Sequence, residues 1–233
     1  MRNIRSKSGP FVERPHFKPG EIDRICADEL TKAELYPSSP QPIRIDRFIE
    51  KRFGVAPEYQ ELPEGVLGFT KFGCRGVEAI VVAKALDEGG GKVAERRLRS
   101  TLAHEGGHGL LHVHLFRQGE KPKSMFDDDD AGPRILCRDV PDVAPTARGY
   151  DGRWWEFQAN KAIGGLLMPR RLVEVALERF CVEAGRLGQR VLPPEQREAA
   201  VRALADVFDV NSAAARLRVE DVFPKTQDAQ LLL

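Results

Sequence analysis

The sequence predicts an α+β fold, because segments with a helical spacing of apolar residues surround one pair of strand-like segments. The stretches EGVLGFTKFG at 64–73 and GVEAIVVAKAL at 76–86 are rich in β-branched and aromatic residues, and glycines separate them, as in a hairpin. A long helical pattern follows at 96–116, then an irregular segment, then more helical patterns. This order of helices, hairpin, long helix, loop and helices is typical of the α+β class.

Helices are expected on both sides of the hairpin. Before it, apolar residues recur at helical spacing in EIDRICADELTKAEL and in QPIRIDRFIEKRFG, and Gly54 provides a C-terminal stop for the second helix. After the histidine-containing segment, the expected helices cover 153–169, 170–187, 194–208 and 211–220. The second strand of the hairpin, at 77–86, is also a candidate edge strand on which an extended peptide could pair.

This pattern predicts three segments. Residues 1–20 are expected to form a flexible basic arm, and residues 21–172 form the main domain. That domain contains a long loop insertion at 117–152, which has several prolines and no clear period. Residues 173–233 are expected to form a helical C-terminal subdomain.

Composition excludes several classes of partner. Lysine and arginine total 36 and aspartate and glutamate total 35, so the chain has no global field that would attract nucleic acid or an anionic membrane. No apolar run approaches the roughly 18 residues of a transmembrane helix, and the first 20 residues lack the apolar core of a secretory signal. The 4 cysteines are widely separated, which favours reduced thiols and a cytoplasmic location.

The segment TLAHEGGHGLLH at 101–112 contains the pattern H-E-x-x-H. His104 and His108 are four residues apart, so on a helix they share one face with their Cβ atoms roughly 6 Å apart. Both imidazoles can therefore bind one zinc ion, and Glu105 can flank the ion without binding it. In zinc peptidases such a carboxylate takes a proton from the attacking water. The pattern predicts zinc ligands at His104 and His108 and a catalytic carboxylate at Glu105.

His112 offers a second possible pair, with His108. All three histidines cannot share one ion, because His104 and His112 lie about 12 Å apart along the helix axis. The first pair encloses the glutamate and is preferred, so His112 is expected to be buried and hydrogen-bonded. Gly106 and Gly107 each cost about 1 kcal/mol in a helix relative to alanine, and they are expected to admit another backbone close to this helix.

A catalytic zinc site usually has a third protein ligand. The downstream candidates are carboxylates and one thiol: the aspartates at 127–130, Cys137, Asp139, Asp142, Asp151 and Glu156. Glu156 is preferred, because it lies on a predicted helix beside an apolar stripe that would hold this helix against the core. Asn160 is four residues further on, so it would face the same way and could fix the tautomer of His104 by a hydrogen bond.

The segments RRLRSTLAHEGGHGLLH and WWEFQANKAIGGLLMP together resemble the ImmA/IrrE family of zinc metallopeptidases, and the resemblance extends over about 41–172. It implies a zincin-like metallopeptidase core with Zn²⁺ held by His104, His108 and Glu156. It implies Glu105 as the catalytic acid/base. It also implies a cytoplasmic enzyme or regulator that removes a helix-turn-helix transcriptional repressor, in mobile-element or stress control.

These observations together predict a zinc-dependent endopeptidase that acts on a protein substrate. One alternative is a zinc-containing module that sequesters a regulator without cleaving it, but such a module would not require Glu105. A second alternative is a DNA-binding regulator that uses the helix-turn-helix-like segment 204–218. Acidic and basic side chains balance between Glu195 and Arg218, which disfavours a basic DNA-reading face and thus nucleic acid as a partner. The sequence predicts no oligomeric state.

Overall fold

The computed structural model describes residues 2–5, 13–17, 20–117, 134–138, 153–184 and 189–224. Over these residues the chain has a mixed α+β fold, which confirms the predicted class. The helices are α1 (Glu21–Lys32), α2 (Ile45–Phe53), α3 (Lys84–Glu88), α4 (Gly91–Leu111), α5 (Val113–Arg117), α6 (Trp154–Leu167), α7 (Arg170–Ala176), α8 (Arg197–Phe208) and α9 (Ser212–Val222). The strands are β1 (Arg2–Arg5), β2 (Glu13–His16), β3 (Glu58–Gln60), β4 (Val66–Gly73), β5 (Gly76–Ala83), β6 (Arg134–Arg138), β7 (Val182–Ala184) and β8 (Gln189–Val191).

The largest sheet has four strands in the order β3-β5-β4-β6. The strands β4 and β5 form the predicted antiparallel hairpin, while β3 runs parallel to β5 and β6 runs antiparallel to β4. Along β4 the alternate residues Gly68, Thr70 and Phe72 are buried, as the two-residue period of a half-covered strand requires. This alternation turns Thr70 toward α4, the helix that carries the histidines.

Two features of this sheet differ from the sequence-based expectation. The strand β6 lies inside the segment 117–152 that the sequence predicts to be a loop, because backbone pairing with β4 stabilises a strand that has no local pattern of its own. The strand β5 ends at Ala83, and its last residues pair with β3 on one side and β4 on the other. The expectation that 77–86 offers a free edge is therefore wrong where β3 covers it, and the chain after Ala83 forms α3.

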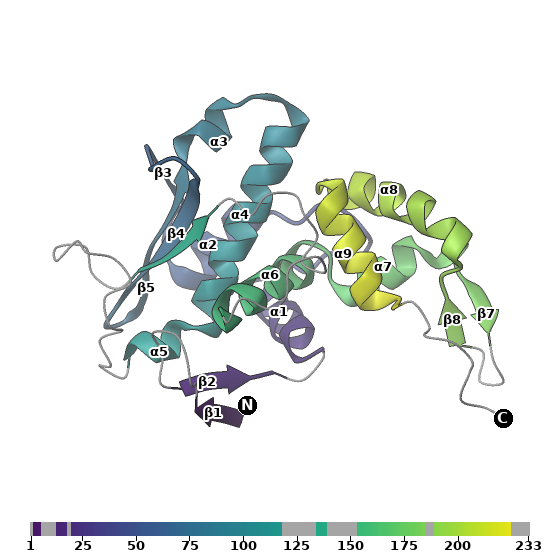
Figure 1. The fold of residues 1–233 in the computed structure, drawn as a ribbon, viewed down its shortest axis with the longest axis horizontal. Helices are drawn as coiled ribbons and strands as arrows, with labels where there is room; N and C mark the ends of the chain where they lie inside the picture. The colour runs from purple at the N-terminus through teal and green to yellow at the C-terminus, as the bar shows by residue number, and fades with distance from the viewer. Residues whose placement is uncertain are drawn as a thin grey trace.

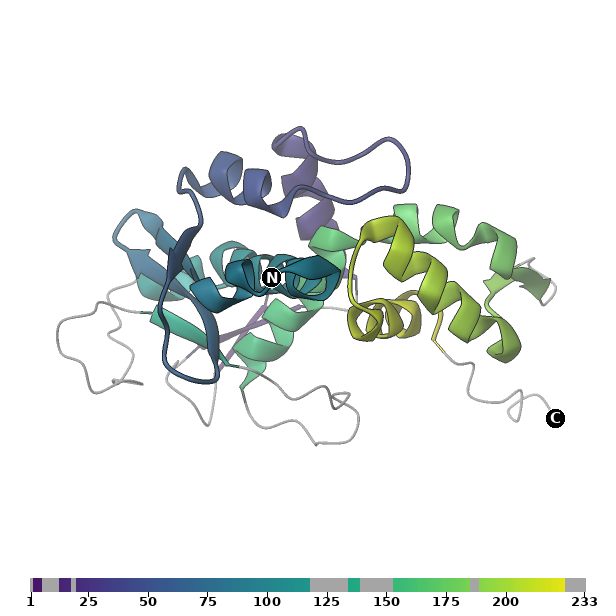
Figure 2. The ribbon, with the colours of Figure 1, turned by 90° about the horizontal axis from the view of Figure 1, so that it is seen from above.

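The helix α4 runs through the middle of the fold (Figure 1). Seen from above, the sheet lies on one side of α4, while α1 and α2 lie on another side and α6 on a third (Figure 2). Residues of α4 are accordingly buried in an unbroken run from Thr101 to Gly109, rather than along a single stripe. Such burial is expected of a helix that is enclosed by its neighbours on several sides.

Residues 170–184 and 189–224 form a second lobe beside α6 (Figure 1). The helix predicted over 170–187 ends at Ala176 instead, and a short 3₁₀ turn follows at Glu178–Phe180. Cys181 then takes an extended backbone, and the β-branched residues Val182 and Val191 pair across β7 and β8. The helices predicted at 194–208 and 211–220 correspond to α8 and α9.

Charged side chains attach this lobe to the main domain. Asp209, which ends α8 in a left-handed conformation with φ 50°, accepts hydrogen bonds from Arg96 and Arg99 of α4. Arg218 of α9 is buried, and it donates to the main-chain oxygen of Met168 and to the Asp23 carboxylate. These contacts bring α9 against both α6 and α1.

At the N-terminus, β1 pairs with β2 within the segment that the sequence predicts to be a flexible arm.

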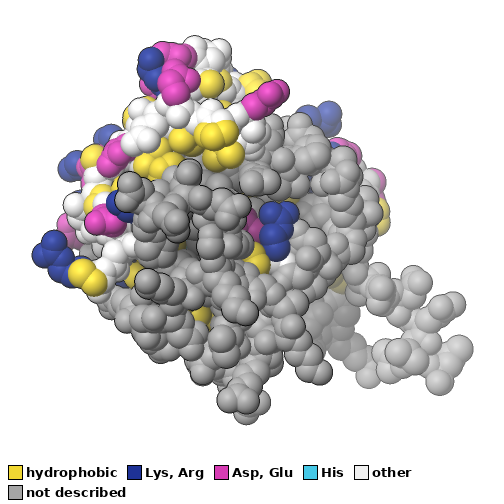
Figure 3. Space-filling model, turned by 60° about the vertical axis from the view of Figure 1, so that its left-hand side comes forward, with side chains coloured by type: hydrophobic (Ala, Val, Ile, Leu, Met, Phe, Trp, Pro, Cys, Tyr) yellow, Lys and Arg dark blue, Asp and Glu magenta, His cyan; other side chains and the backbone are white. Residues whose placement is uncertain are grey.

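On the described part of the face shown in Figure 3, basic and acidic side chains are interspersed, and hydrophobic side chains gather between them near the top. Among the described helices, none combines the length and the apolar character needed to cross a membrane.

The two adjacent glycines of α4 are expected to respond oppositely to alanine substitution. A Cβ at Gly107 would lie 2.8 Å from Ala162 Cβ and 3.3 Å from the backbone of Ala159, so α4 and α6 would have to separate. We expect Gly107→Ala to lower the free energy of unfolding by about 1–3 kcal/mol. A Cβ at Gly106 would meet atoms only at 3.7 Å and 3.9 Å, so Gly106→Ala should raise the free energy of unfolding by about 0.5–1 kcal/mol.

Urea unfolding of both variants beside the wild type measures these changes. An equal loss of stability in both variants would contradict the asymmetry. The predicted close approach of a second backbone is thus found at Gly107 and not at Gly106.

Candidate metal centre

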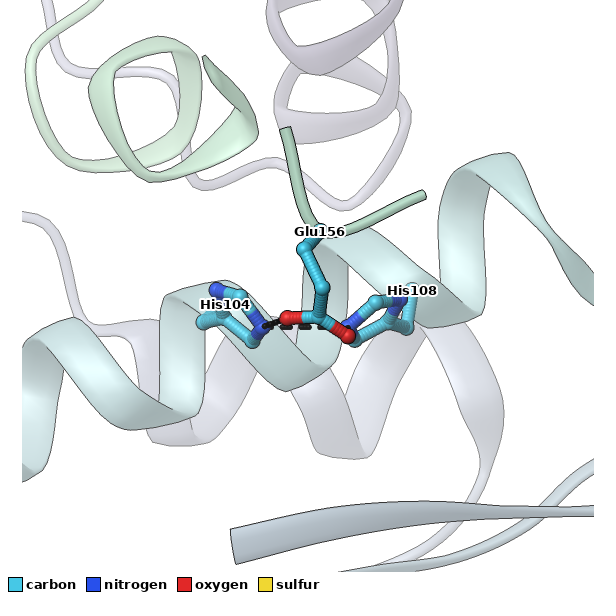
Figure 4. Close-up of side chains that lie close together, drawn as sticks. All are labelled: His104, His108 and Glu156. Atoms are coloured by element: carbon cyan, nitrogen blue, oxygen red, sulfur yellow. Dashed lines mark hydrogen bonds and ion pairs between the residues drawn. The ribbon is translucent and has the colours of Figure 1, made fainter. Parts of the chain in front are cut away.

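His104 and His108 lie one turn apart on α4, and their rings meet edge to face (Figure 4). The two Nε2 atoms are 3.0 Å apart. Both residues are buried, and His108 has no exposed surface. The one-turn spacing that the sequence predicts therefore brings two imidazole nitrogens to one point in the interior.

Glu156 reaches the same point from the first turn of α6. One carboxylate oxygen lies 3.1 Å from His104 Nε2 and the other lies 3.6 Å from His108 Nε2 (Figure 4). The ligand atoms of the three residues all lie within 4.8 Å of one another, so this group could hold a metal ion. We call these three residues the metal centre.

The packing of α6 explains why Glu156 is in reach. The predicted apolar stripe does face the core: Trp155, Ala159 and Leu166 are buried, and its fourth member, Ile163, is partly buried against the core. The helix can approach α4 closely because Gly107 faces Ala159 without a side chain. Because α6 packs closely against α4 at Gly107, the first turn of α6 brings Glu156 to His104 and His108.

Burial sets the charge of the second histidine. Desolvation lowers the pKa of His108 well below its ordinary value, and the charges that His104 and His112 would carry lower it further. His108 is therefore neutral at neutral pH, which is the state that binds a metal. The centre then combines neutral imidazole with a carboxylate, and a cation placed there would compensate the carboxylate charge.

Asn160 contacts the first histidine from the next turn of α6. Its Oδ1 lies 3.1 Å from His104 Nδ1. When the ring nitrogen donates to this oxygen, the lone pair of a neutral His104 is on Nε2, toward His108 and Glu156. The contact is the one that the four-residue spacing from Glu156 predicts.

Glu105 is fully buried, but it is not part of the metal centre. Its carboxyl group lies against β4, where Oε2 is 2.6 Å from the Thr70 hydroxyl. Burial raises the pKa of Glu105 to about 8, although the His104 charge and the Thr70 hydrogen bond lower it in part. The other oxygen, Oε1, has no hydrogen-bond partner among the residues that the structure describes.

Two contacts of this region are not predicted by the sequence. The Thr70 contact could be anticipated only from the inward position of Thr70 on β4, once the pairing of that strand is known. The second contact involves His112, which is buried and hydrogen-bonded as expected, and which contacts both His108 and Gln158. Gln158 lies on α6 between Glu156 and Asn160, and neither its type nor its spacing indicates this role.

The other candidates for the third ligand lie at positions whose side chains are not among those that the structure describes. The aspartates at 127–130, Asp139, Asp142 and Asp151 lie outside the described residues. Cys137 lies on β6, but its side chain is not among those described. The remaining cysteines, Cys26, Cys74 and Cys181, have free thiols and lie outside the metal centre.

The segment 204–218 does fold as a helix, a turn and a helix, with Asp209 in the left-handed conformation at the turn. Its arginines, however, are engaged within the protein. Arg216 forms an ion pair with Glu198, and Arg218 is buried against Asp23 and the main chain of Met168. These two arginines do not form a free basic face of the kind that a DNA reader presents.

Comparison of the chain with protein-family models, with curated proteins and with solved structures found no match. The functional conclusion therefore depends on the residues of the metal centre and on what surrounds them.

Proposed function

We propose that the protein is a zinc-dependent endopeptidase with a zincin-like core, in which His104, His108 and Glu156 hold the zinc. One observation carries this proposal. Three metal-ligating groups from two helices converge in the interior, and the first of them is followed in the chain by a buried glutamate, one oxygen of which has no partner within the described parts of the chain. A purely structural zinc site has no use for such a carboxyl group.

The ligand set of these three residues is compatible with zinc. Two imidazole nitrogens and one carboxylate oxygen form a ligand set that zinc has in catalytic sites, where three protein ligands leave one position open. Soft thiolate ligands are lacking among the described side chains of the centre, and hard oxygen-only sets that suit magnesium or calcium are not formed either. The short separations of 3.0 Å and 3.1 Å between ligand atoms leave room for one ion rather than two.

Bound zinc supplies Lewis acidity, which activates water near neutral pH and polarises a substrate carbonyl. A cation held by the three ligands would favour the ionised form of Glu105, whose pKa burial otherwise raises to about 8. Glu105 Oε1 would then accept the proton of the attacking water, and the same carboxyl group would later donate that proton to the leaving amine. The Thr70 hydroxyl holds Oε2 and so keeps the carboxyl group in one orientation. Asn160 keeps the His104 lone pair on Nε2.

The resemblance to the ImmA/IrrE family supports a narrower proposal for the substrate, namely a helix-turn-helix transcriptional repressor in the cytoplasm. The alternative of a module that binds a regulator without cleaving it is less well supported, because it gives no role to the buried Glu105 carboxyl group.

A cleavage experiment tests the proposal. Zinc-loaded protein is incubated with intact proteins from a cell extract whose own proteases have been inactivated, and new termini are identified by mass spectrometry. We expect new internal termini that disappear when 1,10-phenanthroline removes the metal and return when zinc is restored. Cleavage that persists in metal-free protein would contradict a zinc mechanism. Stoichiometric zinc without any new termini would instead favour the binding module.

A further inference from the structure

A chain of hydrogen bonds runs from the second metal ligand through the interior to the N-terminal hairpin. His108 Nδ1 lies 2.9 Å from His112 Nδ1, and His112 Nε2 lies 3.0 Å from Gln158 Oε1. Gln158 Nε2 in turn lies 2.8 Å from the main-chain oxygen of Pro15 in β2. The three side chains are buried, so water does not substitute for these partners.

The main-chain oxygen of Pro15 determines which group donates in each of these hydrogen bonds. A main-chain carbonyl can only accept a hydrogen bond, so the Gln158 amide nitrogen must face Pro15 and its oxygen must face His112. The amide oxygen also only accepts, so the proton of a neutral His112 must be on Nε2. The lone pair of His112 is then on Nδ1, toward His108.

The same argument determines the tautomer of His108. Because His112 Nδ1 accepts, His108 Nδ1 must donate, and the lone pair of a neutral His108 is on Nε2. That atom is the one 3.0 Å from His104 Nε2 and 3.6 Å from a Glu156 oxygen. The carbonyl of residue 15 thus determines, through two side chains, which nitrogen of His108 is available to a metal ion.

We propose that His112 and Gln158 are positioning residues of the metal centre, which hold His108 in the tautomer whose Nε2 faces the ion and connect it to β2. This inference rests on the metal centre of the proposed function. A partner that orients a metal-binding histidine is typically worth about 10- to 100-fold in metal affinity.

Zinc affinity and the His108 tautomer are measured separately. Zinc dissociation constants at neutral pH come from competition with a chromophoric chelator. We expect His112→Phe, which keeps a ring but removes both nitrogens, and Gln158→Leu to raise the dissociation constant by about 10- to 100-fold. His112→Asn, whose oxygen can take the place of Nδ1 as an acceptor, should restore most of the affinity. Leu111→Ala, a buried change at the neighbouring position of α4, is the control for general loss of packing and should leave the affinity unchanged.

The tautomer is read from ¹H–¹⁵N spectra of metal-free, ¹⁵N-histidine-labelled protein, in which 5 histidines have to be assigned. We expect the His108 proton on Nδ1 in the wild type and a mixture of tautomers in His112→Phe. A His108 proton on Nε2 in the wild type would overturn the inference. Equal losses of zinc affinity in His112→Phe and Leu111→Ala would also overturn it.

The two proposals fail in different ways. Zinc that binds the wild type and His112→Phe equally well refutes the positioning role and leaves the metal centre intact. Wild-type protein that binds no zinc refutes both.

Discussion

Replacement of Glu105 by glutamine is expected to lower the rate of peptide hydrolysis by about 10²- to 10⁴-fold and to leave the zinc content unchanged. Glutamine has nearly the same shape, and its amide oxygen can still accept a hydrogen bond from Thr70, which now bonds Glu105 Oε2. The amide cannot accept a proton from water or return one to the leaving amine. Turnover of a cleaved protein and zinc content by mass spectrometry measure the two quantities on the same sample.

The matched control for this variant is Glu95→Gln, which makes the same chemical change at an exposed position of α4. We expect the control to retain wild-type turnover. A Glu105→Gln protein that holds zinc and cleaves at the wild-type rate would show that this carboxyl group does not transfer the proton. A variant that has lost its zinc would show that Glu105 supports the metal centre rather than the chemistry.

Removal of the third ligand is expected to have the largest effect on metal binding. Glu156→Ala leaves two imidazoles, because within the described residues the metal centre contains no other carboxylate. We expect the zinc dissociation constant to rise by more than about 100-fold, since a group that only orients a ligand is already worth about 10- to 100-fold. Competition with a chelator measures this constant, and circular dichroism checks that the variant is folded.

The control here is Glu174→Ala, which removes a half-exposed carboxylate from α7. Its zinc affinity should equal that of the wild type. Wild-type affinity in Glu156→Ala would mean that the third ligand comes from another segment, and the aspartates at 127–130 would be the next residues to replace.

The parts of this structure that could be predicted from the sequence depend on short-range patterns. The position of His104 and His108 on one face follows from the pitch of a single helix, and the hairpin follows from two adjacent strand-like segments. The contact of Asn160 with His104 was predictable in the same way, because Asn160 and Glu156 share one face of α6. Resemblance to a known family added the pairing of that helix with α4.

The rest depends on contacts between residues far apart in the chain. The strand β6 exists through its pairing with β4, so its own residues carry no strand pattern that distinguishes them from a loop. The path from His108 ends at Pro15, 143 residues from Gln158, and no local spacing relates those two positions. Gly106 and Gly107 look equivalent in the sequence, and only the positions of Ala159 and Ala162 on α6 separate their roles.

Zinc K-edge X-ray absorption of the zinc-loaded wild-type protein tests the metal centre most directly. We predict one zinc per chain with only nitrogen and oxygen ligands, including two imidazoles at about 2.0–2.1 Å and a carboxylate oxygen at about 2.0–2.2 Å. A sulfur ligand at about 2.3 Å would place a cysteine on the metal and would contradict the assignment of His104, His108 and Glu156 as its protein ligands.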